Sequence, residues 1–443
     1  MFILEENKMT EIQYQRILKV RKEYDVLVAG AGPAGICAAV AAAREGVTVA
    51  LIERYGVLGG NLTVGFVGPI LGIVGSGTMR DELVQLLGVP ENDMLGWKGK
   101  KHDVEQAKIA LEELVDQESN IDVYLQSMVS DVIMEQERIR GLVISGNEEP
   151  YILGGKIVID ATGDANVCVH AGCEIEKGRE DGLMQPVSLE FTVDGVDEKK
   201  GVICVGDIDP VKLDGIRFLD YCKQCADQGL LPKTLAAVRL HPTVYSGERQ
   251  VNTTQENGVD VTKTEQIFRA DVALRKQIRT LVQFFRNHLP GYENCKCIAS
   301  GDTTGIRESR RVIGDYVITA EELAAGKRFK DAIVHKAEFI VDIHNPSGAG
   351  QAEETIQYCK PYDLPYRCFI PKGIANLYTA GRCISGTHRA HASYRVMSIC
   401  MAMGEAVGVA AALCAKKNCD TRKLQISELQ ETLCRKGIDL FSA

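Results

Sequence analysis

Residues 25–53 alternate between apolar and polar stretches in the pattern of a strand, a turn, a helix and a second strand. The apolar run DVLVA at 25–29 is followed by a glycine-rich turn, then by ICAAVAAAREG at 36–46 and VTVALIE at 47–53. Short apolar runs bounded by turn residues are typical of buried strands, and the longer alanine-rich stretch between them is typical of a helix. The pattern predicts a βαβ unit.

Further strands and two long helices are predicted along the chain. Residues 121–145 alternate as several short strands with a turn near Glu137 and Arg138, and KIVIDATGD at 156–164 has the pattern of another buried strand. NLYTAG at 376–381 predicts a late strand, whereas 268–289 and 397–415 have helical patterns, the second almost wholly apolar. The fold class is therefore α/β: a Rossmann-like domain with a parallel sheet, helices and a small antiparallel sheet.

Changes in periodicity suggest the domain boundaries. The mixed-charge segment 1–22 is interpreted as an N-terminal extension, and 23–180 with 331–425 as one discontinuous nucleotide-binding domain. The pattern weakens between 181 and 330, which predicts an inserted α+β substrate or cap domain. Residues 426–443 are interpreted as a C-terminal tail.

Composition narrows the class of protein. The chain has 443 residues, enough for two or three domains at about 150 residues each, and 45% of them are hydrophobic. Its net charge of −9 disfavours a nucleic acid partner. The apolar helix at 397–415 is long enough to span a membrane, but Glu405 lies at its centre, which favours a buried helix and no membrane partner. Fifteen cysteines without a signal-peptide pattern predict reduced thiols and a cytoplasmic protein.

The glycine-rich turn carries the clearest chemical signal. Its residues are Gly30, Ala31, Gly32, Pro33, Ala34 and Gly35. In this fingerprint the first glycine permits the turn, the second lets a pyrophosphate approach the backbone, and the third lets helix and strand pack closely. Glu53 ends the second strand, where a carboxylate accepts hydrogen bonds from a ribose. The alternative is a purely structural turn, but the strand, helix and acid in register favour a dinucleotide site.

Segments outside the fingerprint indicate FAD. Glu53-Arg54 followed by Leu58-Gly59-Gly60-Asn61, and Asp160-Ala161-Thr162-Gly163-Asp164, resemble the FAD-dependent oxidoreductases of the glutathione-reductase-like class. GIRESRRVIGDYVIT at 305–319, PYRCFIPKGIANLYTAGRCIS at 365–385 and HASYRVMSICMAMG at 391–404 resemble a broad family of FAD-dependent oxidoreductases that includes relatives of the heterodisulfide reductase flavin subunit. The resemblance covers both ends of the chain and leaves most of 181–300 unassigned.

The resemblance implies a set of cofactor contacts. Gly30 to Gly35 would hold the pyrophosphate, Glu53 and Arg54 the adenosine end, and Gly59, Gly60 and Asn61 the region beside it. Val129 would present backbone to the adenine. The remaining residues would lie along the flavin: Ala161, Thr162, Gly163, Gly381, Arg382, Ser393, Val396 and Met397.

Two features of the class's NADPH disulfide reductases are missing from the sequence. A second GxGxxG with strand and helix around it is not found, and GGNLTVGFVGP carries no cysteine pair after its first Gly-Gly. Electrons are therefore expected to pass between the flavin and a small-molecule substrate, a quinone-like acceptor or a protein partner.

Four side chains are candidates for catalysis. His388, His391 and Arg395 lie just before the helix expected to face the flavin, where histidine can act as acid or base and arginine can bind an anion. Arg307 in GIRESRR is the fourth. The structural alternatives are loop hydrogen bonds for the histidines and charge pairing at a domain boundary for Arg307.

Other reactive residues have simpler explanations. Cys222, Cys225, Cys295 and Cys297 could be four metal ligands, but their spacing favours ordinary thiols, and no metal is predicted. Asp342 and His344 could reach the pocket, and Cys383 lies close to the flavin segment; structural roles are favoured for all three.

The sequence predicts an FAD-dependent oxidoreductase that transfers hydride between flavin N5 and a small organic substrate. His388 or His391 would be the acid or base, and Arg307 or Arg395 the orienting cation. Two alternatives stay open: an electron-relay subunit that holds FAD for a protein partner, and a flavin-dependent RNA-modifying enzyme. The substrate, the direction of electron flow, covalent flavin attachment and a homo-oligomeric state are not specified.

Overall fold

A seven-stranded sheet forms the base of the molecule in the computed structural model, which describes residues 15–89, 101–206, 209–348, 350 and 357–442. The strand order is β3-β2-β1-β6-β5-β4, and β17 also pairs with β6. The strands are β1 (Val20–Ala29), β2 (Val49–Ile52), β3 (Ile121–Tyr124), β4 (Met128–Glu135), β5 (Arg138–Ser145), β6 (Tyr151–Asp160) and β17 (Leu377–Thr379). Strands β1, β2, β3, β6 and β17 are parallel, whereas β4 and β5 form an antiparallel hairpin. The predicted α/β class with a small antiparallel sheet is confirmed.

Strand β1 is buried on both faces of the sheet. Val26 and Val28 belong to the core cluster on the side of the helices, and Leu27 and Ala29 belong to the cluster on the opposite side. Successive side chains of a strand point to opposite faces, so a strand covered on both faces is continuously apolar. This explains why 25–29 reads as an unbroken apolar run.

Helices α1 (Pro33–Arg44) and α9 (Met397–Lys417) pack together on one face of this sheet. The other helices of this domain are α2 (Met79–Leu86), α3 (Val104–Asp116), α4 (Asn166–His170), α7 (Ala320–Ala325), α8 (His388–Tyr394) and α10 (Ile426–Arg435). Helix α9 is long and apolar enough to span a membrane, but its apolar window lies wholly inside the protein. Its composition is therefore explained by its place in the core.

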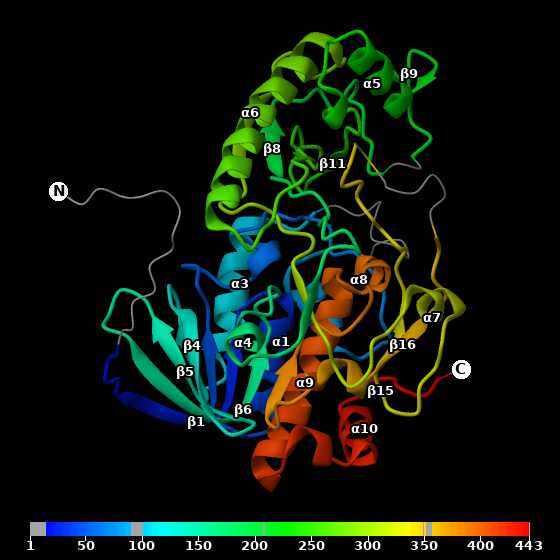
Figure 1. Cartoon of the computed structure of the whole chain (residues 1–443). Coiled ribbons are helices and arrows are strands. Elements are labelled where there is room, and N and C mark those ends of the chain that lie inside the picture. Colours follow the sequence, from blue (N-terminus) through cyan, green and yellow to red (C-terminus); the bar gives the residue numbers. More distant parts are fainter. Residues whose placement is uncertain (1–14, 90–100, 207–208, 349, 351–356, 443) are drawn as a thin grey trace, which may run out of the picture.

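A second domain lies above the first and has its own core (Figure 1). Its antiparallel sheet has the order β11-β12-β8-β13. Its elements are β8 (Phe191–Asp194), β9 (Lys212–Leu213), β10 (Ile216–Arg217), α5 (Phe218–Asp227), β11 (Leu240–Pro242), β12 (Arg249–Val251), α6 (Thr264–His288) and β13 (Lys296–Ser300). Helix α6 matches the helical pattern at 268–289.

Shorter elements connect and extend the two domains. The remaining strands are β7 (Ile175–Lys177), β14 (Arg310–Val312), β15 (Ala332–Ala337) and β16 (Tyr362–Pro365). The 3-10 turns are η1 (Gly60–Leu62), η2 (Lys233–Leu235), η3 (Tyr366–Phe369) and η4 (Thr421–Lys423).

Three of the domain boundaries expected from the sequence lie elsewhere in the structure. Strand β1 begins at Val20, inside the expected extension 1–22, of which residues 1–14 lie outside the described chain. Strand β14 pairs with β7, and Val312, Ile318 and Leu323 belong to core clusters of the first domain, so the stretch from Arg310 to 330 packs there rather than in the inserted domain. The expected tail 426–443 contains α10, whose Leu429 and Leu433 are fully buried in the first core.

Candidate functional site

A cavity of about 1080 Å³, counting the part open to solvent, lies at the carboxyl ends of β1, β2, β6 and β17. Ligands of open α/β sheets bind at this edge, where the loops after the strands converge. The loops bring together the glycine-rich turn, the segment from Glu53 to Asn61, the start of β4, residues 161–166, residues 303–306 and the start of α9. The cavity is thus built from parts of the chain that are hundreds of residues apart.

The three glycines of the fingerprint have different surroundings. A side chain on Gly30 would come within 2.6 Å of the Ala161 carbonyl oxygen, and one on Gly35 within 1.8 Å of the Gly30 carbonyl oxygen. Gly32 lines the cavity and has no atom within 4 Å of where its side chain would be. Gly30 and Gly35 are therefore needed for packing, whereas Gly32 leaves open space in which a ligand can approach the backbone.

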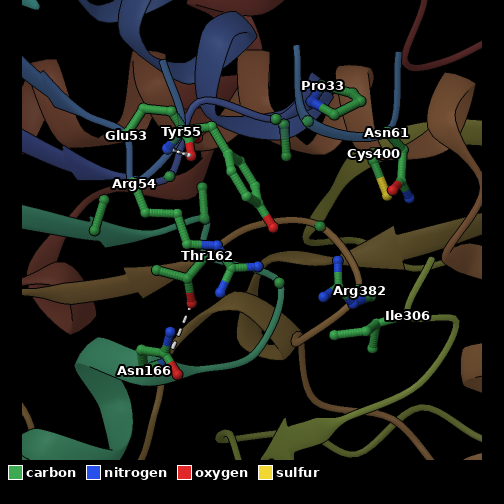
Figure 2. A pocket seen from close by; sticks show the side chains of 18 of the residues that line it. Pro33, Glu53, Arg54, Tyr55, Asn61, Thr162, Asn166, Ile306, Arg382 and Cys400 are labelled. Atoms are coloured by element: carbon green, nitrogen blue, oxygen red, sulfur yellow. Dashed lines mark hydrogen bonds between the residues drawn. The ribbon is translucent and has the colours of Figure 1, made fainter. Parts of the chain in front are cut away.

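Glu53 is buried at the edge of the cavity and holds two loops in place. Its carboxylate accepts hydrogen bonds from the amides of Ala31 at 2.7 Å and Tyr55 at 3.0 Å. Figure 2 shows Glu53, Arg54 and Tyr55 along one wall of the cavity. Each carboxylate oxygen has a further lone pair, so the group can also accept a ribose hydroxyl.

Most of the residues that the resemblance assigned in and beside the fingerprint line the cavity, whereas Ala31, Gly35 and Gly59 do not. Gly60, Asn61, Val129, Ala161, Thr162 and Gly163 line the cavity together with Gly30, Gly32, Pro33 and Ala34. Gly59 lies outside the cavity lining. Its amide donates to the Ala31 carbonyl at 2.8 Å, and its φ of 109° requires glycine. Ala31 also lies outside the lining, and contributes its amide to Glu53.

Arg54 and Arg382 meet at one buried carboxylate, although the resemblance placed them at opposite ends of the cofactor. The Arg382 guanidinium donates to Asp164 at 2.6 Å, and that of Arg54 lies 3.7 Å from the other oxygen of Asp164. Burial raises the pKa of Asp164, but the charges of Arg382 and Arg54 outweigh this effect and hold it below its usual value. Both arginines line the cavity and face it in Figure 2.

The start of α9 forms the opposite end of the cavity. Gly381, Met397 and Arg395 line it, and no side chain caps the first turn of α9. Val396 and Ser393 do not line it: Val396 is the N-cap residue of α9, and the Ser393 hydroxyl donates to the Phe339 carbonyl at 2.8 Å. The amides of an uncapped helix terminus favour negative charge nearby.

This donor set fits a dinucleotide cofactor. Helix α1 also begins without a side-chain cap, beside the open space at Gly32, which suits a pyrophosphate. The first turn of α9 suits the ring system of a reduced flavin, which carries negative charge.

The four predicted catalytic residues do not all reach the cavity. Arg395 lines it and donates to both the carbonyl and the carboxylate of Asp342 at 3.0 Å. Arg307 follows Ile306, which lines the cavity, and donates to the Pro186 carbonyl at 2.9 Å. His388 and His391 are not among the lining residues.

The two histidines have contrasting surroundings. His388 contacts the carboxylate of Glu308 through Nδ1 at 2.7 Å, and Glu308 also accepts from Arg311 at 2.6 Å. His391 is completely buried, neither of its ring nitrogens has a hydrogen-bond partner, and burial together with Arg311 lowers its pKa well below the usual value. His388 is held by a charged network, whereas His391 is a neutral ring packed against Tyr394.

The other candidates take structural positions. Arg310 and Arg311 donate to loop carbonyls of the first domain, those of Asp164, Gly386 and Gly178. Cys222, Cys225 and Cys295 are buried and Cys297 is exposed; in the described part of the chain no group of three or more His, Cys, Asp or Glu could hold a metal ion. Cys383 is buried, and burial raises its pKa well above the usual value.

Several lining residues were not identified from the sequence. They are Ala29, Ile52, Tyr55, Val64, Ser127, Met128, Asn166, Thr303, Thr304, Ile306, Ala380 and Cys400. Thr303 to Ile306 come from the expected cap domain immediately before GIRESRR, and their position next to that segment was the available signal.

Comparison with known proteins decides the family. The family model described as FAD dependent oxidoreductase matches residues 25–433. The chain belongs to this family. It is therefore an FAD-binding enzyme, and the cavity described above has a donor set that fits this cofactor.

Two curated relatives match parts of this oxidoreductase at the sequence level. It is 30% identical to a thiamine thiazole synthase from Aeropyrum pernix over 207 residues, which are 43% of this chain and 72% of that protein. It is 37% identical to a soluble pyridine nucleotide transhydrogenase from Mycobacterium bovis over 75 residues, 17% of this chain and 15% of that protein. The structure of a geranylgeranyl bacteriochlorophyll reductase-like protein from Thermoplasma acidophilum aligns with a TM-score of 0.48 at 15% identity, over 94% of this chain and 84% of that one.

Proposed function

We propose that this oxidoreductase binds a small organic substrate at the Met397 end of the cavity. FAD supplies the redox chemistry, as acceptor or donor of a hydride at N5. The observation that carries the proposal is the position of Arg395, a cation 13% exposed that lines the cavity two residues before the start of α9. A cation fixed at this point can orient a polar substrate against the flavin.

Arg395 and Arg307 form the proposed orienting pair. Asp342 holds one end of the Arg395 guanidinium, while its Nε atom is buried without a partner. Burial lowers the pKa of Arg307 to about 10, and the charge of Arg395 adds to this effect. An arginine fork binds a carboxylate or a polarised carbonyl through parallel hydrogen bonds, which fixes the geometry of the reacting carbon.

His388 is the proposed acid or base. Glu308 holds its Nδ1 and sets the orientation of the ring, so Nε2 is the atom that would exchange a proton with the substrate. Because the ring does not line the cavity, the proposal requires a proton path, such as a bound water, between them. His391, buried and without a polar contact, is the weaker candidate.

The test is anaerobic reduction of the purified holoenzyme. Its flavin spectrum is recorded before and after addition of fractionated pools of organic metabolites, NADH or NADPH. Bleaching by an organic pool, with little effect of the nicotinamides, supports the proposal. Flavin that no small molecule reduces contradicts it and favours the electron-relay alternative.

Substitution separates the roles of the two histidines. His388→Gln should slow flavin reduction by about 100-fold or more, since general acid–base catalysis contributes about 10²–10⁴-fold. His391→Gln serves as the matched comparison from the same helix. Unchanged rapid reduction in both variants would remove histidine from the mechanism.

A further inference from the structure

The inserted domain turns a polar face of its sheet inward. His241 of β11, Gln250 of β12 and Thr192 of β8 lie opposite one another in register, and all three are buried. Two positions along the strands, Arg239 and Glu190 continue the same face and are also buried. The alternate positions, such as Leu240, Val251 and Phe191, form the apolar core of this domain.

A buried polar face is unusual in an antiparallel sheet. An antiparallel sheet with one apolar face normally turns its polar face to water, because burial of polar groups without partners is costly. Here the polar face is enclosed, since Lys101 lies against it with its ammonium 3.6 Å from Glu190. The fold retains a buried polar surface that packing alone does not require.

Cations from both domains converge on this face. Arg307 donates to the side-chain oxygen of Asn252 at 3.5 Å, and the Asn252 amide donates to the Arg239 carbonyl at 3.2 Å. Glu190 directly precedes the neighbouring strand β8, Arg395 binds Asp342 at 3.0 Å, and the charges of all four groups act on Arg307. Lys101 joins the cluster through Glu190. We call Lys101, Arg239, Arg307 and Arg395, with the carboxylates Glu190 and Asp342, the interdomain cluster.

Burial is the main effect on the titratable groups in and beside the interdomain cluster, and nearby cations add to it for the two histidines. Burial lowers the pKa of Lys101 to about 8. Burial, followed by the charge of Arg307, lowers the pKa of His344 to about 4, and burial with Lys101 and Arg239 lowers that of His241 well below its usual value. The cluster thus offers several cationic side chains to an anionic group, and such a group would favour their charged forms.

Among the described residues, several buried polar atoms around this cluster have no hydrogen-bond partner. They include Lys101 Nζ, His241 Nε2, Gln185 Nε2, Arg395 Nε and Thr304 Oγ1. Buried polar groups of a folded protein are almost always hydrogen-bonded, so such a concentration indicates a place for a ligand or for water. Arg395 and Thr304 also line the flavin cavity, which connects the two sites.

We infer that the interdomain cluster binds an oxyanion group, carboxylate or phosphate, of a small organic molecule lying between the inserted domain and the flavin. The inference rests on the proposed function in one respect, namely that this molecule is the substrate. Arg307 and Lys101 would bind the anionic group, whereas Glu190 would limit its affinity by repulsion. Glu190 therefore acts as a specificity-determining residue.

The test measures binding to the oxidised holoenzyme without turnover. Equilibrium dialysis with labelled oxalate or labelled inorganic phosphate gives affinities, and oxamide, the neutral analogue of oxalate, is tested as a competitor. Saturable binding of one anion, with no competition by oxamide, is expected. Preference for oxalate assigns a carboxylate, and preference for phosphate assigns a phosphate group.

Two substitutions should shift this affinity in opposite directions. Arg307→Met should weaken binding by at least about tenfold, because a charge-assisted contact is lost. Glu190→Gln should tighten it several-fold, since the amide can still bind Gln250 while the repelling charge is removed. Arg279→Met, an exposed arginine on α6, is the matched control and should leave binding unchanged. A purely structural disturbance would not produce opposite signs.

The outcomes separate this inference from the proposed function. Absence of saturable binding of either anion, or equal weakening by Arg307→Met and Glu190→Gln, would overturn the inference even if an organic pool reduces the flavin. Binding with the expected signs, in a protein whose flavin no pool reduces, would support the anion site and contradict the proposed function.

Discussion

Glu405 is an ionisable side chain in the middle of the most apolar helix of the protein. Its carboxylate accepts a hydrogen bond at 2.7 Å from the amide of Met79, the first residue of α2, and so takes the place of a missing N-cap side chain. Burial raises the pKa of Glu405 from 4.5 to about 7, and the Met79 amide opposes this shift only in part. The Glu405 carboxylate therefore stabilises the start of α2, but its burial makes the stability of the protein depend on pH.

Glu405→Gln should stabilise the protein more at pH 8 than at pH 5. In the wild type the unfolded chain loses the proton first, so stability falls as pH rises from about 4.5 to 7 and is then constant. The variant keeps an oxygen for the Met79 amide and removes this loss, a gain of up to about 3 kcal/mol above pH 7. Denaturant unfolding of both proteins at the two pH values measures it. An equal change in stability at both pH values would contradict the raised pKa of Glu405.

Gly32→Val should give a folded protein that does not bind FAD. A side chain at Gly32 has no neighbour within 4 Å, and the backbone there is extended with φ of −75°, so the fold accommodates valine. The same side chain would occupy the space assigned to the pyrophosphate, and flavin affinity should fall by about 100-fold or more. Flavin content after purification and circular dichroism of the apoprotein provide the measurements. Retention of flavin would show that the cofactor does not pass Gly32.

At the scale of elements, the contact between α1 and α9 depends on small residues. Side chains on Gly404 and Gly408 of α9 would come within 2.0 Å of the Ala34 carbonyl oxygen and 2.3 Å of that of Ala38 in α1. Both helices are rich in alanine, which lets their backbones approach closely. This contact holds the fingerprint and the flavin-facing helix, which lie about 370 residues apart in the chain, in one site.

Gly408→Ala should therefore destabilise the protein. Alanine in place of glycine inside a helix normally gains about 1 kcal/mol, but the overlap with a backbone oxygen should outweigh this gain and leave a net loss of about 1–3 kcal/mol. Urea unfolding of the apoprotein measures the effect. Gly206→Ala, where the added atom meets nothing within 4 Å, is the control. A more stable Gly408→Ala variant would mean that the helices can separate without cost.

At the scale of the whole molecule, two cores with separate residues support two domains. Leu281 of α6 is fully buried in the core of the inserted domain, which shares no residue with the cores beneath the flavin site. The two domains meet at polar groups, including the interdomain cluster and the network of Glu308 with Arg311 and His388. A substitution that destabilises one core should therefore have little effect on the stability of the other.

Leu281→Ala should loosen the inserted domain and leave flavin binding intact. Removal of a buried leucine side chain costs about 2–5 kcal/mol. Hydrogen exchange should accelerate in α5, α6 and β8 and stay unchanged in β1 and α1, while the flavin content remains that of the wild type. Uniform acceleration across both domains would show that they unfold as one unit.

The sequence by itself determined the nucleotide-binding half of this protein, because its signals are local. The fingerprint, Glu53 and the apolar runs that became β1, β2, β6 and α9 each follow from backbone geometry or from burial within a few residues. The fingerprint and the family resemblance together pointed to segments 30–35, 59–61, 161–163 and 381–382, and most of these residues line the cavity, although Ala31, Gly35 and Gly59 do not.

Only the tertiary structure decided how distant charges are combined. Arg54, Asp164 and Arg382 meet across more than 300 residues of chain, and Lys101, Glu190, Arg239, Arg307 and Arg395 converge from five separate segments. Neither grouping leaves a period or a spacing in the sequence, since each depends on how two domains pack. His388 and His391 are three residues apart but lie in different environments, because the residues around each come from distant parts of the chain.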